Sequence, residues 1–213
     1  AMAGAEIREL ALPILQRLLE GMRPVRNRHV PVLVLVPTRE LAQQVEAVFQ
    51  SLCAHLPQRT RTQAVFGGVS INPQMIALQG VQVLVATPGR LLDLIEAKAV
   101  HLGDVQVLVL DEADKMLNRE FEEELGRLLK LLPRKRQNLL YSATLNAGVS
   151  TTSDLLLHKP EVIQCTTAPQ EVTLIEQRAF RITPERKGPL LRYLIHTMDM
   201  AQVLVFTATS HGA

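Results

Sequence analysis

The chain has 213 residues, which is enough for one complete domain and part of another. Hydrophobic residues make up 47% and charged residues 21%, an ordinary composition for a globular protein, and no apolar run approaches the roughly 20 residues of a membrane span. The formal net charge of +2 is too small to argue for or against a nucleic-acid partner. Aromatic residues are only 3%, so the core must be built from aliphatic side chains.

The two cysteines, Cys53 and Cys165, are far apart and form no C-x-x-C pair. This spacing indicates neither a zinc site nor a disulfide framework. Free cysteines are commonly buried, which favours two reduced, buried thiols in an intracellular protein. The N-terminus shows no signal peptide. We therefore expect a cytoplasmic protein without membrane contact, with an organelle or the nucleus as open alternatives.

Short apolar runs alternate along the chain with stretches of helical periodicity. The runs that predict buried strands are 32–36, 64–66, 81–86, 105–110, 138–141 and 162–164. The stretches that predict helices are 41–52, 91–95 and 121–132. Strands and helices that alternate in this way predict an α/β fold, in which a parallel sheet with right-handed crossovers is covered by helices on both faces.

A polar cluster follows each of several predicted strands, and ligands of parallel sheets bind beyond the carboxyl ends of the strands. After the strand at 105–110 come two adjacent carboxylates, Asp111 and Glu112. One can hold Mg²⁺, usually through water, and the other can orient an attacking water or take a proton from it. The alternative is that the pair caps the next helix and fills its first turn, where acids are favoured anyway.

Three further clusters lie at residues 37–39, 67–68 and 87–90. The first and third combine a hydroxyl, an arginine and a helix start, where backbone N–H groups favour a phosphate. The second is a glycine pair that lets a backbone approach closely. Such groups bind the phosphate–sugar backbone and carry little sequence information. The alternative is that the threonines are ordinary caps and the glycines an ordinary turn.

Together these clusters spell a series of motifs. Residues 111–114 read D-E-A-D; before them come P-T-R-E-L-A at 37–42, G-G at 67–68 and T-P-G-R-L at 87–91, and after them comes S-A-T at 142–144. In order and spacing these resemble the successive motifs of the DEAD-box RNA helicase family. One tetrapeptide is a weak signal, but five motifs in the right order, each at a strand end, are a specific one. The resemblance covers nearly the whole chain.

The resemblance implies a RecA-like sheet that hydrolyses ATP, with Mg²⁺, and couples this to RNA binding and local duplex unwinding. It assigns Asp111, with Glu112, to Mg²⁺ through water, and Glu112 to activation of the hydrolytic water. It also implies that Asp114 pairs with Ser142 or Thr144 and so couples hydrolysis to strand separation. RNA, held mainly by its phosphate–sugar backbone, is assigned to Pro37, Thr38, Arg39, Gly67, Gly68, Thr87, Pro88, Gly89 and Arg90.

The same resemblance divides the chain into domains. Residues 1–165 are expected to form the RecA-like ATP-binding domain, 166–172 a linker, and 173–213 the beginning of a second RecA-like domain. In this last part, 174–182 and 203–206 predict strands and 190–196 predicts a helix. The family's glutamine-containing adenine motif is expected before Ala1, and its arginine finger after Ala213.

One family motif, the P-loop G-x-x-x-x-G-K-[ST], is not found in the sequence. Counting back from residues 10–15, Glu6 and Ile7 stand at its Lys-Thr positions, where a carboxylate would repel a triphosphate. Alternatively, a short piece with the P-loop and its strand is absent between residues 7 and 8. A strand that feeds a P-loop is normally central, and its deletion would expose two neighbouring strand edges. This objection favours a piece left out of the sequence over a true deletion.

Two functions remain open on these grounds. The chain is either part of an ATP-dependent RNA helicase, or a helicase-like module that binds RNA or a protein without hydrolysis. Without a P-loop and an arginine finger, the chain taken literally is not expected to turn over ATP efficiently. A DNA-directed helicase is disfavoured by the D-E-A-D and S-A-T spellings, by resemblance only.

Overall fold

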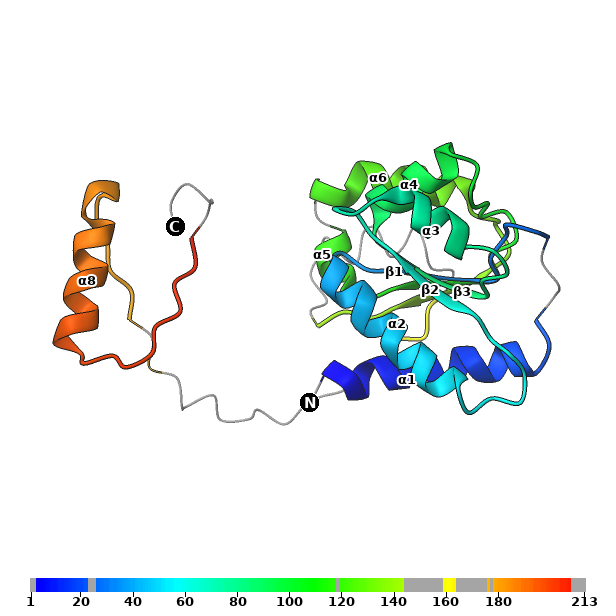
Figure 1. Ribbon diagram of the computed structural model, residues 1–213, viewed down its shortest axis with the longest axis horizontal. Helices are drawn as coiled ribbons and strands as arrows, with labels where there is room; N and C mark the ends of the chain where they lie inside the picture. The colour runs from blue at the N-terminus through cyan, green and yellow to red at the C-terminus, as the bar shows by residue number, and fades with distance from the viewer. Residues whose placement is uncertain are drawn as a thin grey trace. The chain divides into compact units, whose positions relative to one another are not determined.

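A computed structural model describes residues 3–22, 26–117, 119–143, 159–163, 176 and 178–207. The chain divides into two compact units, Ala1–Glu161 and Val162–Ala213. The first unit contains, in chain order, α1 (Ala3–Leu19), β1 (Val32–Leu35), α2 (Arg39–Cys53), β2 (Thr62–Val65), α3 (Ile71–Ala77), β3 (Val83–Ala86), α4 (Pro88–Glu96), β4 (Val107–Leu110), α5 (Ala113–Met116), α6 (Arg119–Leu131) and β5 (Gln137–Leu140) (Figure 1).

The five strands form one parallel sheet in the order β2-β3-β1-β4-β5. The predicted α/β fold with a parallel sheet and helices on both faces is confirmed. The three interior strands β3, β1 and β4 are each paired on both sides, so the described sheet has no gap in its interior. The expectation that loss of a P-loop strand would expose two neighbouring edges is therefore wrong, because only β2 and β5 are edges in this sheet.

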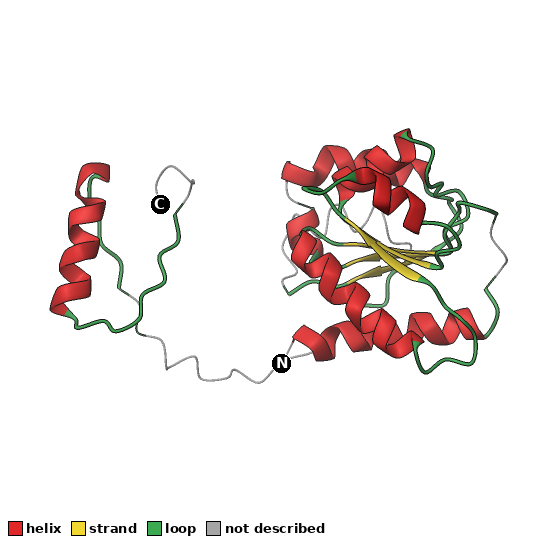
Figure 2. Ribbon diagram, viewed as in Figure 1, coloured by secondary structure: helices red, strands yellow, loops and turns green. Residues whose placement is uncertain are grey.

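The two faces of the sheet carry different aliphatic side chains. Strands β1 and β4 both read Val-Leu-Val-Leu, and their register places like residues side by side. Helices cover both faces of the sheet (Figure 2). The valines pack with α1 and α2, while the leucines pack with α4 and α6, so each face has its own core. Successive side chains of a strand point to opposite faces. Burial of each valine or leucine contributes roughly 1.5–3 kcal/mol, and these two cores hold the strand ends in place.

Helix α1 shows how the chain uses its N-terminal segment. Residues 3–19 form one continuous helix, with Pro13 inside it. Its apolar side pairs Leu10 and Ile14, each 1% exposed, with the valine face of the sheet. Glu6 and Ile7 therefore lie inside a helix rather than in a phosphate-binding loop.

The second unit contains, in its described part, η1 (Pro184–Arg186) and α8 (Lys187–Thr197). The helix predicted at 190–196 is confirmed. The strand predicted at 203–206 is wrong, and so are those at 162–164 and 174–182 wherever their residues are described. A strand needs a neighbour to satisfy its backbone groups, and here Phe206 is 88% exposed with no sheet in the described residues of this unit. The predicted linker lies outside the described residues.

Within the described segments, no helix has the length and apolar character needed to cross a lipid bilayer.

Candidate functional site at the carboxyl edge of the sheet

The order of the strands sorts the predicted site residues into two groups. Thr38, Gly67 and Thr87 follow β1, β2 and β3, which are contiguous in the sheet. Asp111 and Ser142 follow β4 and β5, which are also neighbours. All five strands are parallel, so all these ends lie at one edge, with the residues predicted for RNA on one half and those predicted for hydrolysis on the other. Thr144 lies outside the described residues.

Helix α2 begins at the end of β1. Thr38 is its N-cap, and the Thr38 Oγ1 accepts a hydrogen bond from the Leu41 backbone N–H at 3.3 Å. The alternative reading of Thr38 as a cap is therefore correct as far as its side chain goes. Arg39, the first residue of the helix, is exposed, and its guanidinium carbon lies 5.1 Å from the ring centroid of Phe66. The helix thus presents one cation beside its own N-terminus.

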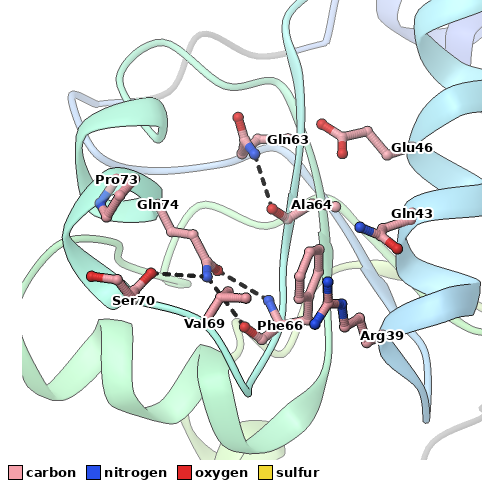
Figure 3. A pocket seen from close by; sticks show the side chains of 10 residues that line it. All are labelled: Arg39, Gln43, Glu46, Gln63, Ala64, Phe66, Val69, Ser70, Pro73 and Gln74. Carbon is pink, nitrogen blue, oxygen red and sulfur yellow. Dashed lines mark hydrogen bonds between the residues drawn. The ribbon is translucent and has the colours of Figure 1, made fainter.

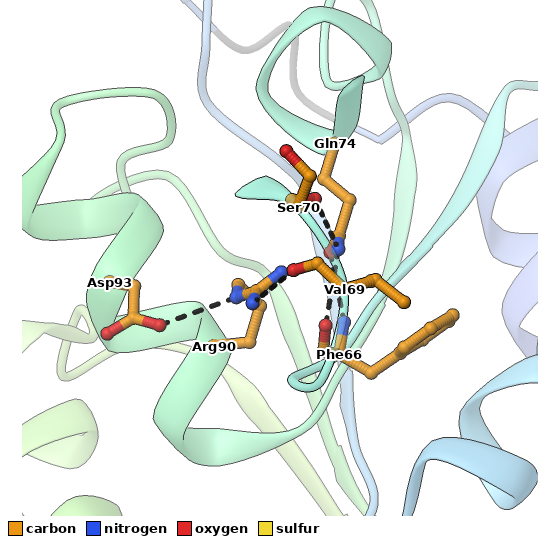
Figure 4. A network of polar contacts seen from close by, with 6 residues as sticks. All are labelled: Phe66, Val69, Ser70, Gln74, Arg90 and Asp93. Atoms are coloured by element: carbon orange, nitrogen blue, oxygen red, sulfur yellow. Dashed lines mark hydrogen bonds and ion pairs between the residues drawn. The ribbon is translucent and has the colours of Figure 1, made fainter. Parts of the chain in front are cut away.

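The loop after β2 has two exposed glycines and is held in place by hydrogen bonds to the Gln74 side chain. Gly68 has a φ of +79°, a left-handed conformation that glycine adopts without strain. A Cβ added at Gly67 or Gly68 would meet nothing within 4 Å, so both backbones are accessible to a ligand. Behind them, the Phe66 N–H donates to Gln74 Oε1 at 3.0 Å, and Gln74 Nε2 donates to the Phe66 carbonyl at 3.2 Å (Figure 4). The Gln74 amide thus acts like a neighbouring peptide group.

Helix α4 begins after β3 and contributes Arg90. The side chain of Arg90 is only 9% exposed. Its Nη2 donates to the Val69 carbonyl at 2.8 Å, and its Nε lies 3.4 Å from Asp93 Oδ2 (Figure 4). Its Nη1 is buried and has no hydrogen-bond partner among the described residues. Arg90 therefore fastens the loop at 67–70 to α4, whatever it contributes to a ligand.

Two neighbours of Arg90 have local structural reasons for their identity. Pro88 occupies the first turn of α4, where its missing N–H costs nothing. A Cβ at Gly89 would lie 3.1 Å from Glu124 Oε1, so the Glu124 carboxylate of α6 occupies the space that the missing side chain leaves. Thr87 is the N-cap residue, but its side chain makes no capping hydrogen bond. Its hydroxyl is not needed by the helix.

The carboxylates after β4 stand in a sharp turn. The Asp111 N–H donates to the Leu35 carbonyl at 3.0 Å, which continues the β1–β4 ladder to the edge. The Glu112 N–H donates to Asp111 Oδ1 at 2.9 Å, and Glu112 itself has φ 50° and ψ 49°. A non-glycine residue in this left-handed region carries strain of about 1–2 kcal/mol, and such strain often marks a functional site.

The charge of Glu112 is balanced within the turn. Lys115 Nζ lies 2.9 Å from Glu112 Oε2, and this hydrogen bond raises the pKa of Lys115. Asp114 lies in α5 and Ser142 just beyond β5, and each has an interaction partner. The sheet brings these two residues to the same half of the edge because β4 and β5 are neighbours.

The residues present do not form a complete site for ATP. A triphosphate needs a cradle of backbone N–H groups and a lysine, but the segment at the P-loop position is helix α1. Burial first, and then the charges of Asp111 and Glu9, raise the pKa of Tyr141, so a carboxylate of α1 lies near the end of β5. The carboxylate pair has the right chemistry for hydrated Mg²⁺. Among the described residues, no cluster of three or more acidic, histidine or cysteine side chains could hold a metal by itself.

Sequence reasoning missed three residues that shape this edge. Phe66 and Gln74 have no motif of their own, although an aromatic residue at a strand end facing an arginine at a helix start is a usable signal for Phe66. Lys115 was open to recognition as an i+3 partner of Glu112. Gln74 becomes conspicuous only when its hydrogen bonds to the end of β2 are seen.

The architecture and its motif-bearing edge define a RecA-like α/β domain, and comparison with known proteins gives the family. The model of the DEAD/DEAH box helicase family matches residues 10–152, and the chain belongs to this family. It is 40% identical over 209 residues to the maize protein named DEAD-box ATP-dependent RNA helicase 3A, chloroplastic, covering 95% of this chain and 28% of that protein.

Two further relatives agree with this assignment. The ATP-dependent rRNA helicase rrp3 of Aspergillus niger is 37% identical, over 93% of this chain and 42% of its own length. The crystal structure of the yeast DEAD-box splicing factor Prp28 superimposes with a TM-score of 0.64 at 28% identity, over 73% of this chain and 37% of the Prp28 chain. The chain thus spans less than half the length of each of these relatives.

Proposed function

We propose that this chain binds single-stranded RNA through the phosphate–sugar backbone, as the RNA-binding face of a DEAD-box helicase. The observation that carries the proposal is the strand order, which gathers the ends of β2, β3 and β1 on one half of the edge. That half offers the N-terminus of α2, the exposed glycine backbones at 67–68 and the Arg39 guanidinium. Backbone N–H groups and arginines are the groups that bind phosphates without reading sequence.

The proposal includes a limit on the chemistry of this chain. The segment at the P-loop position is a helix rather than a phosphate-binding loop, and Glu9 and Asp111 place negative charge near Tyr141. We therefore propose that the chain alone binds RNA without efficient ATP turnover. The relatives are named ATP-dependent, and ATP use with Mg²⁺ held by Asp111 and Glu112 through water is proposed for a helicase that also supplies the phosphate loop.

A second candidate function is the enzyme itself, with this chain hydrolysing ATP to open short RNA duplexes. The left-handed turn at Glu112, φ 50°, favours this candidate because it sets a carboxylate at a strand end at a cost in strain. In that case Glu112 orients the attacking water, and Asp114 with Ser142 or Thr144 couples hydrolysis to strand separation. Residues 173–213 are proposed to begin a second RecA-like domain after the linker at 166–172. The protein is proposed to act inside the cell, in the cytoplasm, with an organelle or the nucleus as alternatives.

The RNA-binding proposal is tested by fluorescence anisotropy with a labelled ten-nucleotide RNA over a series of salt concentrations. Arg39→Ala removes the exposed cation at the proposed face, while Arg59→Ala removes an exposed cation in the loop before β2, at the opposite end of that strand. Each lost phosphate contact lowers the salt dependence, log K against log salt, by about 0.7 for a single strand. We expect this decrease for Arg39→Ala only.

Equal losses for the two variants, or no RNA binding by the unchanged chain, contradict the proposal. The ATP limit is tested separately by phosphate release with and without RNA. Hydrolysis above background that Glu112→Gln abolishes favours the enzyme candidate and overturns the limit. A matching DNA strand tests the preference for RNA, which depends on contacts to the ribose 2′-hydroxyl.

A further inference from the structure

A pocket of about 440 Å³ lies along the free edge of β2, between α2 and α3. One wall is a stripe of α2, formed by Arg39, Gln43 and Glu46, which recur at helical spacing on the flank of the helix next to the buried Ala42, Val45 and Phe49. The floor is formed by Ala64 of β2 and by Phe66, which directly follows β2, and α3 closes the far side (Figure 3). The pocket adjoins the glycine loop at 67–68 to which we assign RNA.

The strand edge that forms the floor has no free backbone groups at Ala64 and Phe66. The Ala64 N–H donates to the Glu46 carboxylate, and the Ala64 carbonyl accepts from Gln63 Nε2 at 2.9 Å. Phe66 is paired through both its backbone groups with the Gln74 amide. An added peptide strand binds a sheet edge through such groups. Because side chains already occupy them, the pocket is poorly suited to an extended peptide.

The groups that remain available suit a flat, polar ring. Arg39 stacks on the Phe66 ring at 5.1 Å and has no ion pair among the described residues. Gln43 is exposed on the same stripe, and its amide has no hydrogen-bond partner in the described part of the chain. An amide can donate and accept side by side, which is how it pairs with the edge of a base. Burial raises the pKa of the neighbouring Glu46 carboxyl.

We propose that this pocket receives one nucleobase of the bound RNA strand, packed against the Phe66–Arg39 pair and hydrogen-bonded at its edge by the Gln43 amide. The inference rests on the proposed RNA binding, because the loop at 67–68 must hold the backbone for a base to enter. The pocket adds a contact to one base, whereas the other proposed contacts are to the phosphate–sugar backbone of the RNA. Base–aromatic stacking is tolerant of sequence, so the pocket adds affinity more than sequence preference.

The test compares two ligands of equal charge on the complete 213-residue chain. One is a strand of ten uridines and the other is a ten-unit ribose-phosphate strand without bases, each measured by competition anisotropy. We expect the uridine strand to bind about tenfold more tightly, the size of one stacked base. Phe66→Leu keeps an apolar side chain without the aromatic ring and is expected to lose most of that difference. Gln43→Ala removes the amide but keeps the ring, so it should lose a smaller part of the difference. Both variants should bind the abasic strand as before.

Gln44→Ala is the matched control, because Gln44 is an equally exposed glutamine one position along α2 that does not line the pocket. It should keep the full difference between the two strands. Equal affinity of the unchanged chain for both strands, or a difference that survives in Phe66→Leu and Gln43→Ala, overturns the inference and leaves the pocket to a protein ligand. Failure of the unchanged chain to bind either strand overturns the proposed RNA binding, and this inference with it.

Discussion

The Gln74 side chain offers the sharpest test of how the edge is held together. It is 8% exposed and is the only buried polar residue in the described part of the chain. Its amide makes two hydrogen bonds to Phe66, at 3.0 and 3.2 Å, and a weaker one to the Ser70 carbonyl at 3.4 Å. A hydrogen bond contributes about 1 kcal/mol net, so Gln74→Leu should cost about 2 kcal/mol of unfolding free energy.

For a chain of this size, that loss corresponds to a decrease of about 4–8 °C in Tm, measured by circular dichroism. Gln74→Glu separates the two bonds. A carboxylate still accepts from the Phe66 N–H but cannot donate to the Phe66 carbonyl, and it is charged in a buried place. Protonation restores the donor, so the deficit of Gln74→Glu should shrink as the pH falls below about 5, because burial raises a carboxyl pKa.

Gln74→Leu has no group that titrates and serves as the control for this pH dependence. A Tm for Gln74→Leu within about 1 °C of the unchanged protein, which is roughly the experimental error, refutes the structural role of the amide. An equal pH response of the two variants refutes the donor argument.

Three other changes test separate features. Lys98 has φ 55° just after α4, so Lys98→Gly should raise the unfolding free energy by about 0.5–1 kcal/mol, whereas Ala97→Gly, at a right-handed position, should lower it, both by urea titration. Thr38→Ala should cost about 1 kcal/mol by losing the N-cap of α2, and Thr38→Ser should restore it; a loss that serine does not restore excludes the cap as its cause. A hydrogen bond from Arg26 lowers the pKa of Asp104 from its ordinary 3.8 to about 2 in the folded protein. The ionised carboxylate therefore stabilises the fold above pH 3.8, and this stabilisation is lost as the pH falls toward 2. Asp104→Asn should therefore be less stable by at most about 1 kcal/mol at pH 7, given solvent screening, and equal near pH 2; a gap that persists at pH 2 contradicts this assignment.

The interior of the sheet was open to prediction from sequence because its strands are continuous apolar runs. Residues 32–36, 81–86 and 105–110 cannot lie at a surface, and β1, β3 and β4 are found within them. The ends of these strands are less predictable, since apolar residues such as Val81 and Val105 are buried outside the ladder. A continuous apolar run predicts burial directly, whereas the residues that pair in the sheet depend on where the neighbouring strand ends.

The site was predicted as a set of motifs but not as a set of contacts. Arg90 shows the difference: its motif indicates a ligand contact, while the structure uses its guanidinium to hold the Val69 carbonyl. The strand predicted at 203–206 shows the reverse limit, because an apolar run says nothing about whether a partner strand is present. Gln74 has no local signal at all, since its role depends on the distance between α3 and the end of β2.

The junction of β1 and β4 has a consequence for variation in this chain. Between the residues proposed for RNA and those proposed for hydrolysis stands the bond from the Asp111 N–H to the Leu35 carbonyl. Both atoms belong to the main chain, so a side-chain exchange at Leu35 or Asp111 leaves the bond chemically intact. Substitutions can therefore change the ligand contacts of either half of the edge more readily than they can remove the backbone hydrogen bond that joins the two halves.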